Sequence, residues 1–188
     1  PGQDCYFEGG TIHGTVDYIC GSGTVYFNGV ELFCEKRNLA GTGSDCITAN
    51  NSQTAQGDKG YIFESCVIKS ECSVISLSRT WNDQPQVVYL NTVFDYSAGD
   101  FSLQDEKGEI NRWTITGMNK VDPYLFGEYN TKDTEGNVIS PASHILTFKG
   151  TLNPTVETIL SAEQAADFSY NAIFTPKAWD PAADAAQV

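Results

Sequence analysis

The sequence predicts an all-β fold, a parallel β-solenoid with long loops and one short helix near its C-terminal end. Two observations lead to this prediction. First, aromatic and β-branched residues alternate with polar ones up to about Asp95, and clusters of Gly, Asn, Ser and Asp separate the alternating stretches, as in short strands joined by turns. Second, one short pattern recurs four times, at Phe7–Ile12, Phe27–Leu32, Phe63–Ile68 and Leu90–Phe94.

The spacing of these four units favours the solenoid over other β folds. The units lie 20, 36 and 27 residues apart, a range typical of solenoids whose coils stack on one another. The extra residues of the second unit fall between Lys36 and Lys59, where turn-forming residues dominate, so we expect them to loop out. A β-sandwich is the alternative, but its strands would be more evenly spaced and need not repeat one phase.

Beyond Asp95 the pattern indicates loops, a few strands and a final helix. We expect long loops over Gly99–Lys120 and Asn130–His144, which are polar and contain Gly and Asp. Ser161–Gln164 has the form of a capping box, and a partly apolar helix face follows it at Ala165, Ala166, Phe168 and Ala172. Such a helix could cover an open end or side of the solenoid, where unpaired strand edges would otherwise be exposed.

Composition excludes several functional classes. The 188 residues fit a single domain over 1–188, and 11 Lys and Arg against 24 Asp and Glu give a net charge of −13. We therefore expect no nucleic-acid partner, because a basic footprint is missing. No apolar run reaches the roughly 18 to 20 residues of a membrane span, and the first residues lack the features of an export signal.

The six cysteines and two histidines predict neither a metal site nor a cofactor. They form no CxxC or Cys/His pattern, and His13 and His144 lie far apart. Buried thiols are expected by default, although the sequence leaves open whether some of them pair. Asn50-Asn51-Ser52 fits a glycosylation acceptor only in a secreted eukaryotic protein.

The repeat predicts that one carboxylate, Asp17, lies close to one guanidinium, Arg79. In Gly14–Gly21, strand alternation places Asp17 opposite the apolar face of Ile12, Val16 and Tyr18. Asp17 precedes Phe27 by 10 residues and Arg79 precedes Leu90 by 11, so both have nearly the same phase, two coils apart. Strands about 4.8 Å apart would put the two backbones about 10 Å apart, a gap that both side chains can bridge.

Several motifs resemble those of the pectin methylesterases, carbohydrate esterases with a right-handed parallel β-helix. Gly14–Gly21, of sequence GTVDYICG, is similar to the family's GTVDFIFG, and Leu77–Trp81, LSRTW, is similar to its LGRPW. The further similar segments are Asp45–Ala49, Gly60–Phe63, Val88–Thr92, Phe126–Asn130 and Leu160–Trp179. The resemblance extends over nearly the whole chain but only to the C-terminal part of the family's domain, so we expect the family's N-terminal coils to be missing.

The resemblance implies a hydrolase that converts methylated homogalacturonan, or pectin, to pectate and methanol. Asp17 would be the nucleophile, forming an acyl-enzyme that water hydrolyses, and Arg79 would hold Asp17 ionised and oriented. Trp81 would stack on a sugar ring, and Tyr18, Cys20 and Met118 would be further substrate contacts. The protein would be a monomer that is secreted, periplasmic or at the cell surface.

The chain departs from the family at the second acid. Gln3-Asp4-Cys5 could be the family's Gln-Asp-Thr motif, with Asp4 as general acid and Gln3 as oxyanion donor. Asp4, however, precedes Phe7 by only 3 residues, which puts it out of phase with Asp17 and Arg79. A further upstream Gln of the family is absent, and losing one oxyanion donor typically costs about 100- to 1000-fold in rate.

Three other functions are alternatives at this point. The missing acid and Gln favour a β-helix that is impaired or truncated and binds pectin without turnover. A pectate lyase would need clustered carboxylates for calcium and a polygalacturonase would need paired Asp residues, and neither pattern surrounds Asp17.

Overall fold

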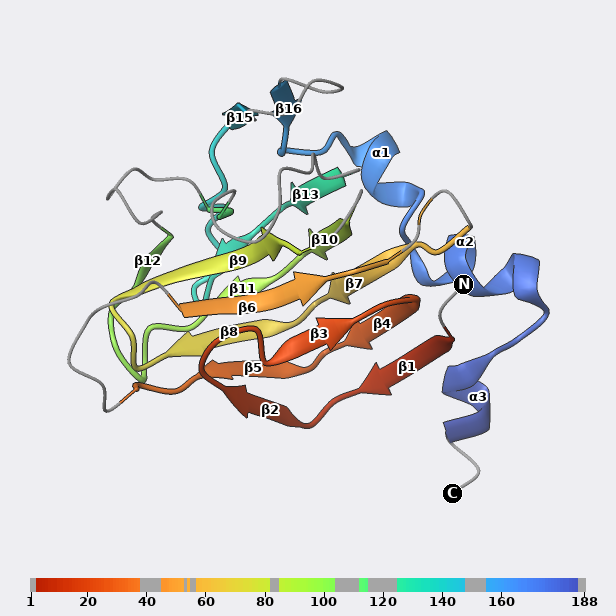
Figure 1. Cartoon of the computed structure of the whole chain (residues 1–188), viewed down its shortest axis with the longest axis horizontal. Coiled ribbons are helices and arrows are strands. Elements are labelled where there is room, and N and C mark those ends of the chain that lie inside the picture. Colours follow the sequence, from red (N-terminus) through yellow and green to blue (C-terminus); the bar gives the residue numbers. More distant parts are fainter. Residues whose placement is uncertain are drawn as a thin grey trace.

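The chain winds through three parallel sheets, and each turn of the chain adds one strand to each sheet (Figure 1). The computed structural model describes residues 3–37, 45–52, 54, 57–81, 85–103, 112–114, 125–147 and 155–185. The first sheet is built from β1 (Asp4–Glu8), β4 (Thr24–Asn28), β7 (Gly60–Glu64), β10 (Gln86–Leu90) and β13 (Leu125–Tyr129). The second contains β2 (Thr11–Gly14), β5 (Glu31–Cys34), β8 (Val67–Ser70), β11 (Val93–Phe94) and β14 (Lys132–Asp133). The third contains β3 (Ile19–Gly21), β6 (Asp45–Asn50), β9 (Val74–Thr80) and β12 (Ser102–Leu103).

This arrangement confirms the predicted parallel β-helix and corrects its repeat by one residue. Phe7, Phe27 and Phe63 are direct neighbours across the first sheet, as the repeat predicts. The fourth member is Tyr89, however, and not Leu90, because Phe63 pairs with Tyr89 and Glu64 with Leu90. The four rings stack inside the solenoid with centroids 5.1, 4.6 and 4.4 Å apart, so stacking sets the phase of each coil.

The expected loop between Lys36 and Lys59 is only partly correct. Its middle forms β6, which lies between β3 and β9 in the third sheet. Ile47 and Ala49 are fully buried there. Burial between two neighbouring strands therefore outweighs the turn-forming residues on either side. Asn50, the candidate glycosylation acceptor, is also fully buried, and its side chain bonds to Ser52 and to the backbone of Gln86.

The turn between the first and second sheets repeats one backbone conformation. One residue in each coil has a left-handed φ of 52° to 62°: Gly9, Gly29, Ser65, Asn91 and Asn130. The amides of the first four members each donate to the carbonyl of the residue that precedes the bend in the next coil. Glycine and asparagine adopt this conformation more readily than other residues, so Ser65 is the unusual member. The sheet-to-sheet corner is thus a continuous hydrogen-bonded ladder.

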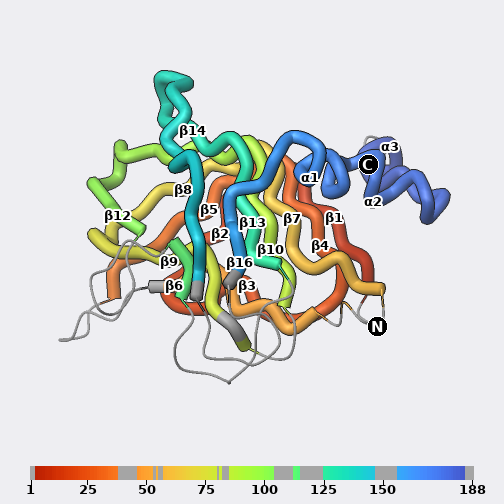
Figure 2. Tube along the Cα trace, turned by 90° about the horizontal axis from the view of Figure 1, so that it is seen from above, coloured from red at the N-terminus to blue at the C-terminus, as the bar shows by residue number. Residues whose placement is uncertain are grey.

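The predicted C-terminal helix exists, but the chain breaks it into short pieces. Ser161 and Gln164 form the expected capping box at the start of α1 (Ala162–Ala166), and Ser169 caps a separate α2 (Tyr170–Phe174). A 3-10 turn (Thr175–Lys177) and α3 (Pro181–Ala185) follow. Leu160, Ile173 and Phe174 pack on the outer face of the first sheet. The helices therefore cover a side of the solenoid, away from β6 and β9 of the third sheet (Figure 2).

The last coils carry a buried ion pair and a small hairpin. Arg112 bonds to Glu128 at 2.6 Å with both side chains buried, and its guanidinium lies 5.8 Å from the ring centre of Phe94. β15 (Ile145–Thr147) and β16 (Thr155–Glu157) pair antiparallel. None of the helices in the described part of the chain has the length and apolar character needed to cross a membrane.

Candidate functional site

Asp17 lies in the bend between β2 and β3, and not inside a strand as the alternation predicted. Its φ is +51°, in the left-handed region, which Asp tolerates better than most residues. The amide of Asp17 donates to the carbonyl of Cys46 in the next coil at 2.7 Å. The bend between the second and third sheets therefore presents the carboxylate at a fixed apex.

Gly14 and Tyr18 hold this bend closed from inside. A Cβ added at Gly14 would lie 2.2 Å from the Cβ of Tyr18, so only glycine fits there. The Tyr18 hydroxyl lies 3.5 Å from the Cys34 sulfur, and its ring packs against the main core. Burial, followed by the nearby Cys34 thiol, raises the pKa of Tyr18 well above its usual value. Packing thus holds the partly buried ring of Tyr18, and its expected contact with the sugar chain stays a prediction.

Asp17 and Arg79 form an ion pair between Oδ2 and Nη2. Arg79 lies in β9, paired with Ala49 of β6, which pairs in turn with Cys20 of β3. The side chains of Asp17 and Arg79 are 20% and 25% exposed, so the pair is accessible but partly desolvated. The remaining Asp17 oxygen, Oδ1, is buried and has no hydrogen-bond partner in the described part of the chain. Arg79 therefore holds Oδ2, while Oδ1 lies buried and without a partner among the described residues.

Small polar groups support the pair from below. Thr48 Oγ1 donates to Ser78 Oγ at 2.6 Å, one residue before Arg79, and both side chains are buried. Cys46 is also buried, and burial, followed by the nearby Asp17 charge, raises the pKa of its thiol. Cys46 is therefore a neutral neighbour of Asp17. Sequence reasoning missed both Cys46 and Gly14, because a backbone carbonyl and a close contact leave no signal in side-chain chemistry.

Asp4 does not join this site, which corrects its expected role as the general acid. It is the first residue of β1, in the first sheet, and its carboxylate bonds to Lys177 at 2.5 Å. In Figure 1, β1 begins beside the N label on the right, whereas the chain turns from β2 to β3 on the left. Gln3 is exposed just before β1, so the oxyanion role expected for it loses its support as well.

The other predicted substrate contacts differ in how exposed they are. Cys20 is exposed at the edge of the third sheet, in the same cross-strand row as Arg79. Trp81 follows β9 directly and is half-buried. Trp113, which is not one of the predicted contacts, is buried, with its ring stacked on Phe126 at 4.9 Å. Met118 lies outside the described residues.

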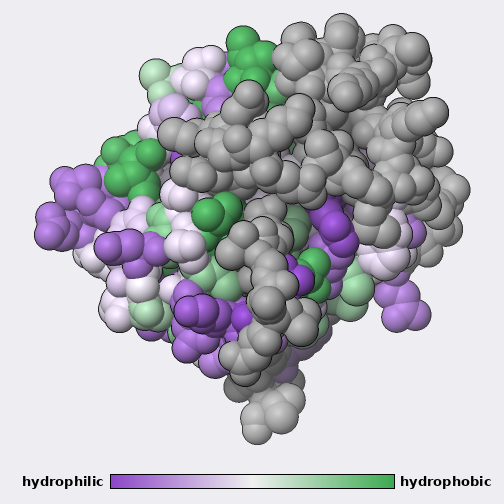
Figure 3. Space-filling view, turned by 60° about the vertical axis from the view of Figure 1, so that its left-hand side comes forward, coloured by the Kyte–Doolittle hydropathy of each residue, from purple (hydrophilic) through white to green (hydrophobic). Residues whose placement is uncertain are grey.

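The six cysteines, all within the described residues, form no disulfide there, and Cys34, Cys46 and Cys66 are buried. Within the described residues, no group of three or more His, Cys, Asp or Glu is arranged to hold a metal. On the coloured part of the face in Figure 3, hydrophobic residues form small separate patches among hydrophilic ones. This surface is consistent with a polar ligand.

These features define a parallel β-helix protein with an accessible Asp–Arg pair at the edge of one sheet. The pectinesterase family model matches residues 2–169, and the chain belongs to the pectinesterase family. It is 29% identical over 143 residues to pectinesterase 2 of Olea europaea, a match that covers 76% of this chain and 34% of that protein.

Solved structures give the same picture of the fold. Pectin methylesterase from Yersinia enterocolitica matches with a TM-score of 0.59 and 25% identity over 90% of this chain and 53% of that one. A pectin methylesterase in complex with a hexasaccharide matches with a TM-score of 0.58 and 20% identity, covering 95% of this chain and 52% of that one. The chain thus spans about a third of the olive relative and about half of each solved chain.

Proposed function

We propose that this chain hydrolyses the methyl esters of homogalacturonan, with Asp17 as the nucleophile and Arg79 as its charged partner. A carboxylate oxygen of Asp17 attacks the ester carbonyl carbon, and the bond to the methoxy oxygen breaks. Methanol leaves after its oxygen takes up a proton from solvent, and water then cleaves the acyl–Asp17 bond to give the uronic acid and the Asp17 carboxylic acid. Both acids ionise, so that one proton replaces the one taken by methanol, a second is released to solvent, and the Asp17 carboxylate is restored.

The observation that carries this proposal is the Asp17–Arg79 ion pair. A guanidinium fixed to Oδ2 orients the carboxylate, and the Asp17 side chain as a whole stays 20% exposed. Membership of the pectinesterase family supports the same chemistry. We further propose that Trp81 and Cys20 border the sugar chain, and that the protein works outside the cell, as a monomer, on pectin in cell walls.

A second candidate function is pectin binding without turnover. It is favoured by the contact between Asp4 and Lys177, because that ion pair engages the one acid that the sequence offered as proton donor. The departing methoxide needs a proton, so a site without an acid would bind esters and turn them over slowly. The two functions differ in a single measurable product, methanol.

The test is methanol release from highly methylated pectin by the chain and by Asp17→Asn, with Asp133→Asn, at the end of β14, as a control. We expect release by the chain and by Asp133→Asn, and a loss of at least about 1000-fold in Asp17→Asn, as for other covalent nucleophiles. Asp4→Asn should retain activity. A folded chain that binds pectin but releases no methanol would contradict the proposed hydrolysis and establish binding without turnover.

A further inference from the structure

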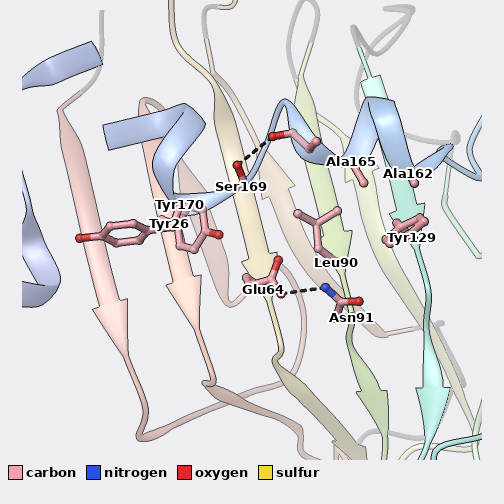
Figure 4. A pocket seen from close by; sticks show the side chains of 10 residues that line it. Tyr26, Glu64, Leu90, Asn91, Tyr129, Ala162, Ala165, Ser169 and Tyr170 are labelled. Atoms are coloured by element: carbon pink, nitrogen blue, oxygen red, sulfur yellow. Dashed lines mark hydrogen bonds between the residues drawn. The ribbon is translucent and has the colours of Figure 1, made fainter. Parts of the chain in front are cut away.

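A hollow of about 380 Å³ opens on the outer face of the first sheet, beneath α1 (Figure 4). Its floor comes from the ends of β7, β10 and β13, and its wall from the α1–α2 segment. It lies on the helix-covered side of the solenoid, away from β6 and β9 (Figure 2). The hollow is therefore separate from the Asp17–Arg79 pair.

Strand register explains why the hollow exists. Glu64, Leu90 and Tyr129 are direct neighbours across three strands, and all point outward. The previous outward row, which includes Ile62 and Val88, is covered by the helical segment. The helix passes over the Glu64 row with alanines only, at 162, 165 and 166. Such short side chains bury Leu90, which is 2% exposed, but leave a hollow beside it.

The polar groups of the hollow are fixed before any ligand arrives. Glu64 Oε1 accepts from Asn91 Nδ2 at 2.9 Å and from Ser65 Oγ at 3.1 Å. Asn130 Nδ2 donates in turn to Asn91 Oδ1 at 2.6 Å. Within the described residues, Glu64 Oε2 accepts no such bond. The hollow thus contains one oriented anionic acceptor among tyrosine rings and an apolar floor.

This set of groups discriminates between ligand classes. No Lys, Arg or His lines the hollow, so an anion such as a free uronate would be repelled. A sugar ring offers several hydroxyl groups, yet the Tyr170 hydroxyl is already bonded to Asp180 and Ser169 Oγ to the backbone of Ala166. A cation suits the site better, because a carboxylate and aromatic faces both attract positive charge.

We propose that this hollow binds a primary alkylammonium ion, with the ammonium group on Glu64 Oε2 and the alkyl chain along the alanines of α1 toward Tyr129. The ammonium binds the carboxylate oxygen that accepts no other bond among the described residues, and the alkyl chain covers the exposed Ala162 and Ala166. The net charge of −13 attracts such a cation from a distance.

The test is a calorimetric or NMR titration with n-butylammonium at low salt, with n-butanol and methyl galactoside as uncharged probes. We expect saturable 1:1 binding of butylammonium and weaker binding of both uncharged probes. Glu64→Gln should weaken the affinity at least about tenfold, since a charged hydrogen bond contributes roughly 1.5–3 kcal/mol. Glu8→Gln is the matched control, because Glu8 lies in the same cross-strand row on β1 but does not line the hollow.

A second variant tests the location by shape alone. Ala162 is exposed at the start of α1, so Ala162→Leu should fold and fill the hollow, and butylammonium binding should disappear. Equal weakening in Glu64→Gln and Glu8→Gln would overturn the proposal in favour of diffuse attraction to the acidic surface. Tighter binding of methyl galactoside than of butylammonium would overturn the ligand class. Methanol release from pectin should be unchanged in all three variants.

Discussion

At the residue scale, the candidate nucleophile owes its position to its neighbours. Asp17 sits at a left-handed bend that its own side chain does not require, and the close approach of Gly14 and Tyr18 keeps that bend in place. The hydrogen bond from its amide to Cys46 then ties the bend to the next coil. Reactivity at this position therefore depends on packing beneath the carboxylate as much as on Arg79.

A substitution at Gly14 should show this dependence. Gly14→Ala forces a Cβ into Tyr18, so we expect a loss of about 3 kcal/mol in the free energy of unfolding, at the upper end for overpacking. Gly10→Ala is the control, because its Cβ meets open space and only its φ of +77° is strained, which costs about 1–2 kcal/mol. Urea unfolding measures both. Equal losses would mean that Tyr18 yields and that the bend is not locked.

At the element scale, the corner between the first and second sheets repeats one conformation, and sequence alone reveals only some of its members. Gly9, Gly29, Asn91 and Asn130 are residues that favour such bends, whereas Ser65 is not. Register shows the same limit at Tyr89-Leu90, where either residue satisfies an apolar repeat and only ring stacking selects Tyr89. Periodicity predicts coils well, but it cannot choose between adjacent apolar residues.

Ser65 offers a direct test of the corner. Ser65→Val should be less stable than Ser65→Gly by about 1–2 kcal/mol, because a β-branched residue is disfavoured at a φ of +53°. The same pair of residues at position 67, in β8, should show the opposite order, with Val67 more stable than Val67→Gly. Chemical unfolding of the variants gives both differences. Matching orders at the two positions would contradict a left-handed requirement at Ser65.

At the scale of the whole molecule, the repeat predicted the stacked parallel sheets and the proximity of Asp17 to Arg79, but not the position of Asp4. Asp17 and Arg79 lie at nearly the same position within their coils, so the repeat alone predicts that they are close together, and the structure shows them as an ion pair. The position of Asp4 against Lys177 could not be read in this way, since it depends on how the C-terminal segment returns to the first coil. The Glu64 hollow depends on the same packing of helix on sheet. The sequence repeat does not predict contacts between segments that are far apart in the chain.

Buried thiols give the whole chain a pH dependence at the alkaline end. Burial raises the pKa of the Cys66 thiol from 9.0 to about 12 and raises that of Cys46 as well. Above pH 9 the unfolded chain loses protons that the folded chain keeps, so the free energy of unfolding falls as pH rises. We expect a loss of about 2 kcal/mol per thiol between pH 8 and 10.5.

Urea unfolding under reducing conditions at the two pH values checks this expectation. Cys66→Ala should be less stable at pH 8, because a buried side chain is truncated, yet its stability should fall less steeply with pH. A slope that is the same in Cys66→Ala and in the unmodified chain would assign the alkaline loss to other groups, of which the buried Tyr18 and Tyr89 are the first to examine.

The stack of rings also ties the coils to one another unequally. Phe27 and Phe63 each lie between two rings of the stack, whereas Phe7 touches one ring among the described residues. Loss of an inner ring therefore breaks two stacked pairs, each worth about 0.5–1.5 kcal/mol. A substitution at Phe27 or Phe63 thus loosens the contacts of a coil with both of its neighbours at once.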